Sequence, residues 1–321
     1  MTFRKAHRPA HGSRRFRLPL ILFAILLWTG NSENSHASEP IPVFVSVPPQ
    51  KYFVEKIGRS LVQVSVMVPP GANPHIYEPR PGQMTALSKS RMYFAVGVSF
   101  ETVWLPKFTK LNPRMRIVHT DEGVEKMAMV EHDHEHEKAA GRKESTEQAH
   151  REEAQASLDP HVWVSPPEVK ILAQNILDAL LELDPANGPA YRSNHDSFVK
   201  EIEKLDNDLR NLFSDKKGLK FMVYHPAWGY FARAYGLEQV PVEVEGKEPK
   251  PEQLKTLIEE ARKQGIKVIF VQPQFSTKSA ETIARAIGGQ VIAADNLRED
   301  WEKNLRVQAQ KFKEALKGQA Q

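Results

Sequence analysis

Six short runs of β-branched and aromatic residues are spaced along the chain between longer amphipathic segments. The runs are PVFVSV from Pro42, VQVSVMV from Val62, MYFAVG from Met92, KFMVYH from Lys220, KVIFVQ from Lys267 and QVIAAD from Gln290. Segments such as 251–265 and 279–289 instead repeat their apolar residues at helical spacing, and the second ends on two glycines. Strands and helices in alternation predict an α/β fold with mostly parallel sheets.

Residues 166–214 differ from this pattern because they contain no strand signal. They hold two helical segments separated by DPANGP, and the second, from Ala190, keeps its apolar residues at helical spacing. A long helix between two α/β halves predicts two lobes, 38–165 and 215–321, joined by a helical connector. The alternative is one doubly wound domain that carries a helical insertion.

Residues 1–37 have the features of an export signal. Basic residues precede an apolar run at 18–28, and a small-residue cleavage site ends at Ala37, after which we expect cleavage. The apolar run is too short to span a bilayer comfortably. SRRFRL from Ser13 loosely resembles a twin-arginine signal, so both the general secretory route and the twin-arginine route stay open.

The net charge of the chain depends on this segment. Residues 1–37 contain six of the 44 Lys and Arg residues but one of the 40 acids, so the remainder carries 38 bases and 39 acids, or −1. A nearly neutral chain gives no reason to expect a nucleic-acid partner. The chain has no cysteine, which excludes disulfides, thiolate metal sites and a lipid-anchoring cysteine. We expect a soluble periplasmic monomer.

Residues 131–156 form a histidine-rich acidic segment. They contain eight acids, four bases and nothing that could pack into a core, so we expect a disordered or mobile loop. Alternate residues of an extended segment point the same way, which allows neighbouring imidazoles to share an ion. The candidate accessory zinc ligands are His132, His134, His136 and His150. The loop is either a local concentrator or sensor of zinc, or a solvated loop with incidental histidines.

Three other histidines and one aspartate lie where a strand or a proline-restricted turn ends. His75 follows the strand VQVSVMV, His161 lies in LDPHVWVSPP, His225 ends KFMVYH and Asp295 ends QVIAAD. In open α/β sheets, ligands bind beyond the carboxyl ends of the strands. Three imidazoles and one carboxylate suit four-coordinate Zn²⁺. Since each half of the chain supplies two of them, the metal would lie in the cleft between the lobes.

Four stretches that contain these residues resemble one known family. They are GANPHIYEPRPGQMTALSKSRMYFAVGVSFE, DPHVWVSPPEV, YHPAWGYFARAYGL and VQPQFSTKSAETIARAIGGQVIAAD. They are similar to the periplasmic zinc-binding proteins of bacterial ABC metal importers, the ZnuA and TroA-like solute-binding proteins. The resemblance extends over nearly the whole mature chain. It implies two lobes joined by a long helix, a metal in the cleft, delivery to a membrane permease, and a histidine-rich insertion typical of zinc members.

The third ligand position bears on which metal is carried. Manganese members of the wider family tend to have Glu there, whereas this chain has His225, and imidazole suits Zn²⁺ while Mn²⁺ prefers oxygen. A manganese or iron receptor of the same importer class is the alternative. The chain departs from the family pattern at AADNL, where Asn296 replaces a proline and puts ligation by Asp295 in doubt.

Two further readings belong to other classes of protein. In a zinc hydrolase, Glu78 would act as general base beside a metal held by three histidines. No HExxH motif is present, however, and a fourth ligand at Asp295 would occupy the position that a reactive water needs. In an exported adhesion protein, the metal would be structural. We favour a binding protein that is not an enzyme.

The remaining histidines and aromatic residues receive simpler interpretations. We expect His119 to be structural or solvated, and His195 to lie on an exposed helix face. Trp163, Trp228 and Phe231 closely follow candidate ligands, so we expect them to line the cleft, and for Phe231 a place in the core is an equal alternative. Ligation needs neutral imidazoles, so zinc affinity should fall as the pH approaches the ordinary histidine pKa of about 6.5.

Overall fold

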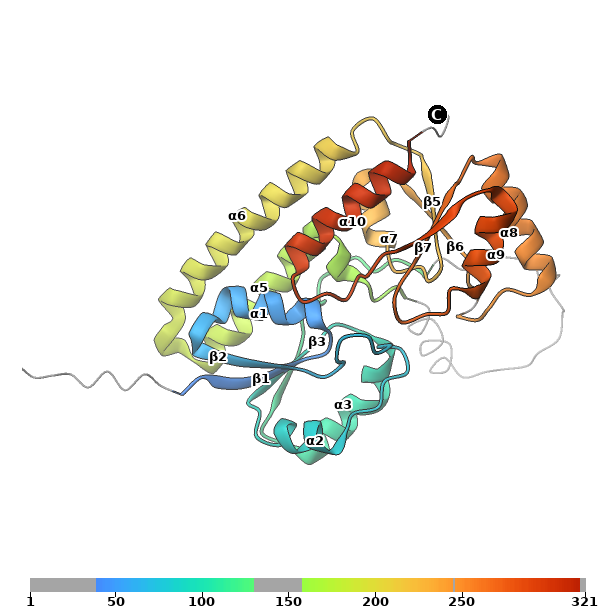
Figure 1. Ribbon diagram of the computed structural model, residues 1–321. Helices are drawn as coiled ribbons and strands as arrows, with labels where there is room; N and C mark the ends of the chain where they lie inside the picture. Colours follow the sequence, from blue (N-terminus) through green and yellow to red (C-terminus); the bar gives the residue numbers. More distant parts are fainter. Residues whose placement is uncertain (1–38, 130–157, 245, 318–321) are drawn as a thin grey trace, which may run out of the picture. The chain divides into compact units, whose positions relative to one another are not determined.

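Two four-stranded parallel sheets, one from each half of the chain, form the framework of the protein (Figure 1). The structure is a computed structural model that describes residues 39–129, 158–244 and 246–317. The expected export signal at 1–37 and the histidine-rich segment, with His132, His134, His136 and His150, lie outside these residues. Among the described residues, no helix has the length and apolar content needed to cross a membrane.

The first sheet has the strand order β2-β1-β3-β4 and the second has the order β6-β5-β7-β8. The strands of the first are β1 (Ile41–Val45), β2 (Val62–Val66), β3 (Met92–Ala95) and β4 (Arg116–His119). Those of the second are β5 (Lys220–Val223), β6 (Glu238–Pro241), β7 (Val268–Val271) and β8 (Gln290–Ala293). The two sheets therefore repeat one topology, in which the second strand along the chain lies outside the first.

Helices flank both sheets and connect them. In the first half they are α1 (Pro48–Gly58), α2 (Pro81–Leu87) and α3 (Ser99–Leu111), and in the middle α5 (Pro166–Leu183) and α6 (Gly188–Leu212). In the second half they are α7 (Gly229–Tyr235), α8 (Pro251–Lys263), α9 (Lys278–Ile287) and α10 (Trp301–Ala315). The predicted α/β fold with two parallel sheets and a long connecting helix is confirmed, while the exact lobe boundaries stay predictions.

The inner strands carry the apolar runs that made them visible in the sequence. All four residues of β3 and all four of β7 are buried, because both faces of a parallel sheet are covered by helices. The strands β4 and β6, which lie at sheet edges, were not predicted from the sequence. Their sequences, RIVH and EQVP, hold fewer apolar residues than the inner strands, and an edge strand is less fully covered than an inner one.

The long helix α6 joins the two halves by its packing. It has 25 residues and contacts α1, α5 and α10 (Figure 1). Its buried side chains recur every three or four residues, at Tyr191, His195, Phe198, Ile202, Leu205 and Leu209. His195 belongs to this buried stripe, so the expectation that it lies on an exposed face was wrong. The helical period of its apolar neighbours extends through position 195.

Candidate metal centre

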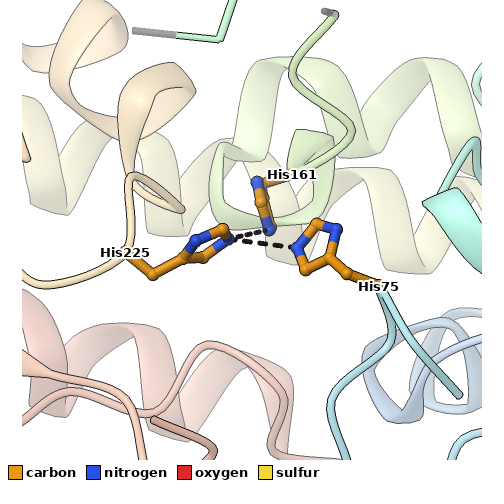
Figure 2. A group of neighbouring side chains, drawn as sticks. All are labelled: His75, His161 and His225. Atoms are coloured by element: carbon orange, nitrogen blue, oxygen red, sulfur yellow. Dashed lines mark hydrogen bonds between the residues drawn. The ribbon is translucent and has the colours of Figure 1, made fainter. Parts of the chain in front are cut away.

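Three histidines from distant parts of the chain come together, and their rings point toward one another (Figure 2). The Nε2 atom of His225 lies 3.1 Å from Nε2 of His75 and 3.3 Å from Nε2 of His161. A tetrahedral zinc ion with Zn–N bonds of about 2.0–2.1 Å separates its nitrogen ligands by about 3.3–3.4 Å. Two of the three separations are therefore close to the spacing that a shared ion would require, and all three ligand atoms lie within 4.8 Å of one another.

His75 lies in the loop between β2 and α2 and is partly exposed. Its backbone N–H donates to Asn73 Oδ1 at 2.9 Å, which fixes the local turn. Its ring Nδ1 lies 3.1 Å from the hydroxyl of Ser99, the first residue of α3. A neutral hydroxyl from the neighbouring strand-to-helix turn thus orients this ring.

His161 is almost fully buried, with 1% of its surface exposed. Asp159 Oδ1 accepts a hydrogen bond from the backbone N–H of His161 at 2.9 Å and lies 2.7 Å from its ring Nδ1. The side of the ring contacts Trp163, with centroids 5.2 Å apart. A buried carboxylate therefore holds this ring so that Nε2 faces the other histidines.

His225 follows β5 and is held from several sides. Its ring Nδ1 lies 2.6 Å from Glu243 Oε1, and the ring stacks on Phe275 at a centroid distance of 4.6 Å. Gln272, at the end of β7, accepts from the backbone N–H of His225 at 3.3 Å and donates to its carbonyl at 2.7 Å. Glu243 is buried, so this histidine also has a buried carboxylate behind it.

The electrostatics of the group favour neutral imidazoles. Burial, together with the charges of the neighbouring His161 and His225, lowers the pKa of His75 to about 2. Burial also lowers the pKa of His161, against the opposing effect of Asp159. When Nδ1–H donates to a carboxylate, the lone pair of Nε2 is left free to bind a metal. At neutral pH the rings of His75 and His161 therefore present nitrogen ligands without needing to lose a proton first.

Asp295, the fourth predicted ligand, does not belong to this group among the described residues. Its Oδ1 accepts a hydrogen bond from the backbone N–H of Leu297 at 2.9 Å, which closes a turn after β8. The residue instead lines a pocket of about 540 Å³ together with Tyr52 and Glu55, and none of the three histidines lines that pocket. Ligation by Asp295 stays a prediction.

The other candidates from the sequence lie outside the group. Glu78 and His119 are exposed. Of the aromatic residues expected to line the cleft, Trp163 contacts a histidine, whereas the ring contacts of Trp228 and Phe231 include each other and core aromatics such as Phe312. These two residues support the second half from within its core.

The groups that contact the Nδ1 side of the histidine rings were not predicted from the sequence. Asp159 lies two residues before His161 in the same LDPH motif, so its proximity could have indicated its role. Ser99, Glu243 and Gln272 are 24, 18 and 47 residues from the histidines that they contact. Contacts over such separations depend on how the chain folds back, which no local pattern reveals.

Comparison with known proteins adds a family to this geometry. Residues 43–315 match the family model described as "ZnuA: Zinc-uptake complex component A periplasmic". The chain is 28% identical over 275 residues to the zinc-binding protein AdcA of Streptococcus pyogenes serotype M3, with 84% of this chain and 53% of that protein covered. It thus spans about half the length of this relative.

Two further similarities cover most of both chains. The high-affinity zinc uptake system protein ZnuA of Bacillus subtilis is 26% identical over 295 residues, which cover 88% of this chain and 89% of the relative. A crystal structure of ZnuA is 40% identical and superposes with a TM-score of 0.77, covering 86% of this chain and 99% of the other. The fold and the family are therefore supported by independent comparisons.

Proposed function

The chain belongs to the family of periplasmic zinc-uptake components described as ZnuA, and from this membership we propose that it captures Zn²⁺ outside the inner membrane and delivers it to an ABC importer. The ion is cargo, and the partner is the importer's permease. The observation that carries the proposal is the convergence of three histidine Nε2 atoms at a spacing suited to zinc.

We propose His75, His161 and His225 as the ligands, each through Nε2. A fourth position can be taken by water or, as the sequence suggested, by Asp295. The buried carboxylates of Asp159 and Glu243 supply negative charge through the imidazoles, because each lies against an Nδ1 atom. These two carboxylates thereby balance the positive charge of the zinc ion although neither binds the ion directly.

The ligand set also bears on the choice of metal. Three imidazoles favour Zn²⁺ over Mn²⁺, which prefers oxygen ligands. For a manganese or iron receptor, the alternative within this class, we would expect more oxygen ligands than this group presents. We propose zinc as the preferred cargo.

The alternatives from other classes receive less support. Glu78 is exposed and outside the histidine group, so it is poorly placed as a general base, and we propose that no covalent reaction occurs. For an adhesion protein with a structural metal, metal removal should unfold the chain. Here the rings of His161 and His225 are held by buried protein groups, so we expect the fold to persist without metal.

The histidine-rich segment 131–156 is proposed as an accessory zinc-binding loop in a periplasmic monomer. Its structural context is limited to its base, where Ala128 and Leu158 form an antiparallel bridge and the backbone N–H of Asp159 donates to the carbonyl of Met127. Since the chain ends at this base are already paired, excision of 131–156 should leave the histidine group in place.

The excised chain gives the sharpest test of the proposal. We expect it to retain one high-affinity zinc site in a competition titration with a chelator, to prefer zinc over manganese, and to remain folded by circular dichroism after metal removal. His119→Ala serves as the matched control because this histidine is exposed and outside the group. Loss of high-affinity binding on excision would place the main site in the loop and overturn the proposal.

A further inference from the structure

Glu101 is a buried carboxylate that the proposed ligand set does not use. It is the third residue of α3 and has 3% of its surface exposed. Buried acids are uncommon unless hydrogen bonds satisfy them. The position of this one, close in sequence to the residue that orients His75, indicates a role in the site.

Three donors converge on the Glu101 carboxylate. Oε1 accepts from the hydroxyl of Ser46 at 2.5 Å and from the backbone N–H of Val96 at 2.9 Å. Oε2 accepts from the backbone N–H of Gly97 at 2.8 Å. Ser46 follows β1, and Val96 and Gly97 follow β3, so one side chain ties the carboxyl ends of the two inner strands to the start of α3.

The turn that Glu101 holds has little freedom to adopt another shape. Gly97 has a φ of +88°, a conformation that residues with a side chain rarely adopt, and a Cβ there would lie 3.0 Å from Asp121 Oδ2. The turn leads through Val98 directly to Ser99. The hydroxyl of Ser99 therefore has its position set by the hydrogen bonds that Glu101 receives.

His75 depends on this arrangement more than the other two histidines do. His161 and His225 each contact a buried carboxylate directly, whereas the Nδ1 of His75 contacts the Ser99 hydroxyl. We propose that Glu101 is a positioning residue for His75, acting through the Val96–Val98 turn and the Ser99 hydroxyl. This inference rests on the proposed zinc-binding function.

The charge of Glu101 responds to pH near neutrality. Burial raises the pKa of Glu101, hydrogen bonds from Ser46, Val96 and Gly97 oppose the rise and the charge of Asp121 adds to it, with a net pKa of about 7. The other groups that face it are Tyr93, whose hydroxyl lies 2.7 Å from the Ser46 hydroxyl, and Lys126, which pairs with Asp121 at 2.7 Å. Protonation of Glu101 turns one of its carboxylate oxygens from a hydrogen-bond acceptor into a donor. The hydrogen bonds that hold the Val96–Val98 turn therefore weaken as the pH falls through 7.

A double-mutant cycle tests the inference in the chain that lacks residues 131–156. Glu101→Gln keeps the size of the side chain but directs an amide NH₂ toward donors. We expect it to lower zinc affinity about tenfold, the lower end of the range for groups behind metal ligands. In a His75→Ala background the same change should cost less than about twofold, because the residue acts through His75. In an Asp159→Asn background the tenfold loss should persist.

A second variant and a control separate positioning from folding. Ser99→Ala removes the hydroxyl that contacts His75 but leaves the Glu101 network intact. The loss of zinc affinity that Ser99→Ala causes should therefore also disappear in the His75→Ala background. Glu125→Gln, at an exposed position of the same half, should leave affinity unchanged. An equal loss from Glu101→Gln with and without His75, or no loss at all, would overturn the inference. Absence of zinc binding by the parent chain would instead overturn the proposed function.

Discussion

The two sheets share one strand order but support the metal centre in different ways. In the second half, His225 follows β5, which is paired on both sides, and its ring is stacked on Phe275 and backed by Glu243. In the first half, His75 lies in a loop after the edge strand β2, and its ring contacts the neutral hydroxyl of Ser99. A repeated topology therefore fixes where ligands emerge, while the groups around each ligand decide how firmly it is held.

Because of this difference we call His161 and His225 the firm part of the histidine group and His75 its adjustable part. His161 and His225 are buried and each has a carboxylate partner, whereas His75 is partly exposed. A receptor must both bind its ion and release it. For the proposed zinc site we therefore expect binding strength to reside mainly with the two buried histidines and His75 to close the site.

Removal of the histidines should produce the largest effects. We expect His161→Ala and His225→Ala each to lower zinc affinity more than about 100-fold, beyond the usual loss for a group behind a ligand. His75→Ala should lose less, because water can reach that partly exposed position. Competition titration of the chain without 131–156 measures all three against His119→Ala. Equal losses at the three positions would contradict the division into firm and adjustable parts.

Replacing the two carboxylates behind the histidine rings should have the next largest effect on zinc affinity. Asp159→Asn and Glu243→Gln should each cost about 10- to 100-fold in zinc affinity, because they orient a ligand ring and raise its basicity. Ser99→Ala, the corresponding change on the His75 side, should cost about tenfold, as expected for Glu101→Gln, which acts through the same hydroxyl. Isothermal titration calorimetry with a competing chelator measures these losses. The comparison fails if the serine variant proves the most damaging.

A clash introduced behind Asp159 should have a somewhat smaller effect. A Cβ on Gly229, the first residue of α7, would lie 2.9 Å from Asp159 Oδ2. Gly229→Ala should therefore displace this carboxylate and lower zinc affinity about tenfold without removing a polar group. Gly82→Ala is the matched control, because nothing lies within 4 Å of its Cβ. Unchanged affinity in Gly229→Ala would show that the position of Asp159 does not matter.

The dependence on pH should be modest and should come from the His75 side. Lowered pKa values keep His75 and His161 neutral well below the ordinary value of about 6.5, so at these rings protons compete with zinc only in more acidic solution. Glu101, with a pKa raised to about 7, gains a proton first as the pH falls. We expect a severalfold decline in affinity across pH 7 that Glu101→Gln abolishes, measured by chelator competition. A steep decline near 6.5 in both proteins would indicate histidines with ordinary pKa values.

Asp295 should give the smallest effect in the arrangement described. Its carboxylate caps the turn at Leu297 and lies outside the histidine group. Asp295→Asn preserves the acceptor oxygen, so we expect a change in zinc affinity of less than about threefold. A loss comparable to that of His225→Ala, in the same titration, would return Asp295 to the ligand set.

The inner strands and the long helix were predictable from the sequence because they are buried in a periodic way. VIFV of β7 is apolar throughout, and the buried stripe of α6 repeats every three or four residues. The edge strands β4 and β6 were not predictable, since the two hydrophobic residues of RIVH and the one of EQVP do not exceed the background of a loop. The prediction for His195 was wrong because it followed the polar side chain of this residue and not its position in the buried stripe of α6.

The convergence of the histidines was predictable from the positions of His75 and His225 after strands, from the proline-restricted turn at His161 and from the family resemblance. Their supporting groups were not. Glu243 and Ser99 reach His225 and His75 only because β6 ends beside β5 and α3 begins beside the loop after β2. Such contacts arise from tertiary folding, and a single sequence carries no periodic signal for them.

The most direct test of the proposed centre is a crystal structure of the zinc-loaded protein with anomalous data collected at the zinc absorption edge. We predict a strong anomalous peak about 2.0–2.1 Å from the Nε2 atoms of His75, His161 and His225, with Asp159 and Glu243 still bound to the Nδ1 atoms. Zinc bound elsewhere, with no peak among these three nitrogens, would contradict the account.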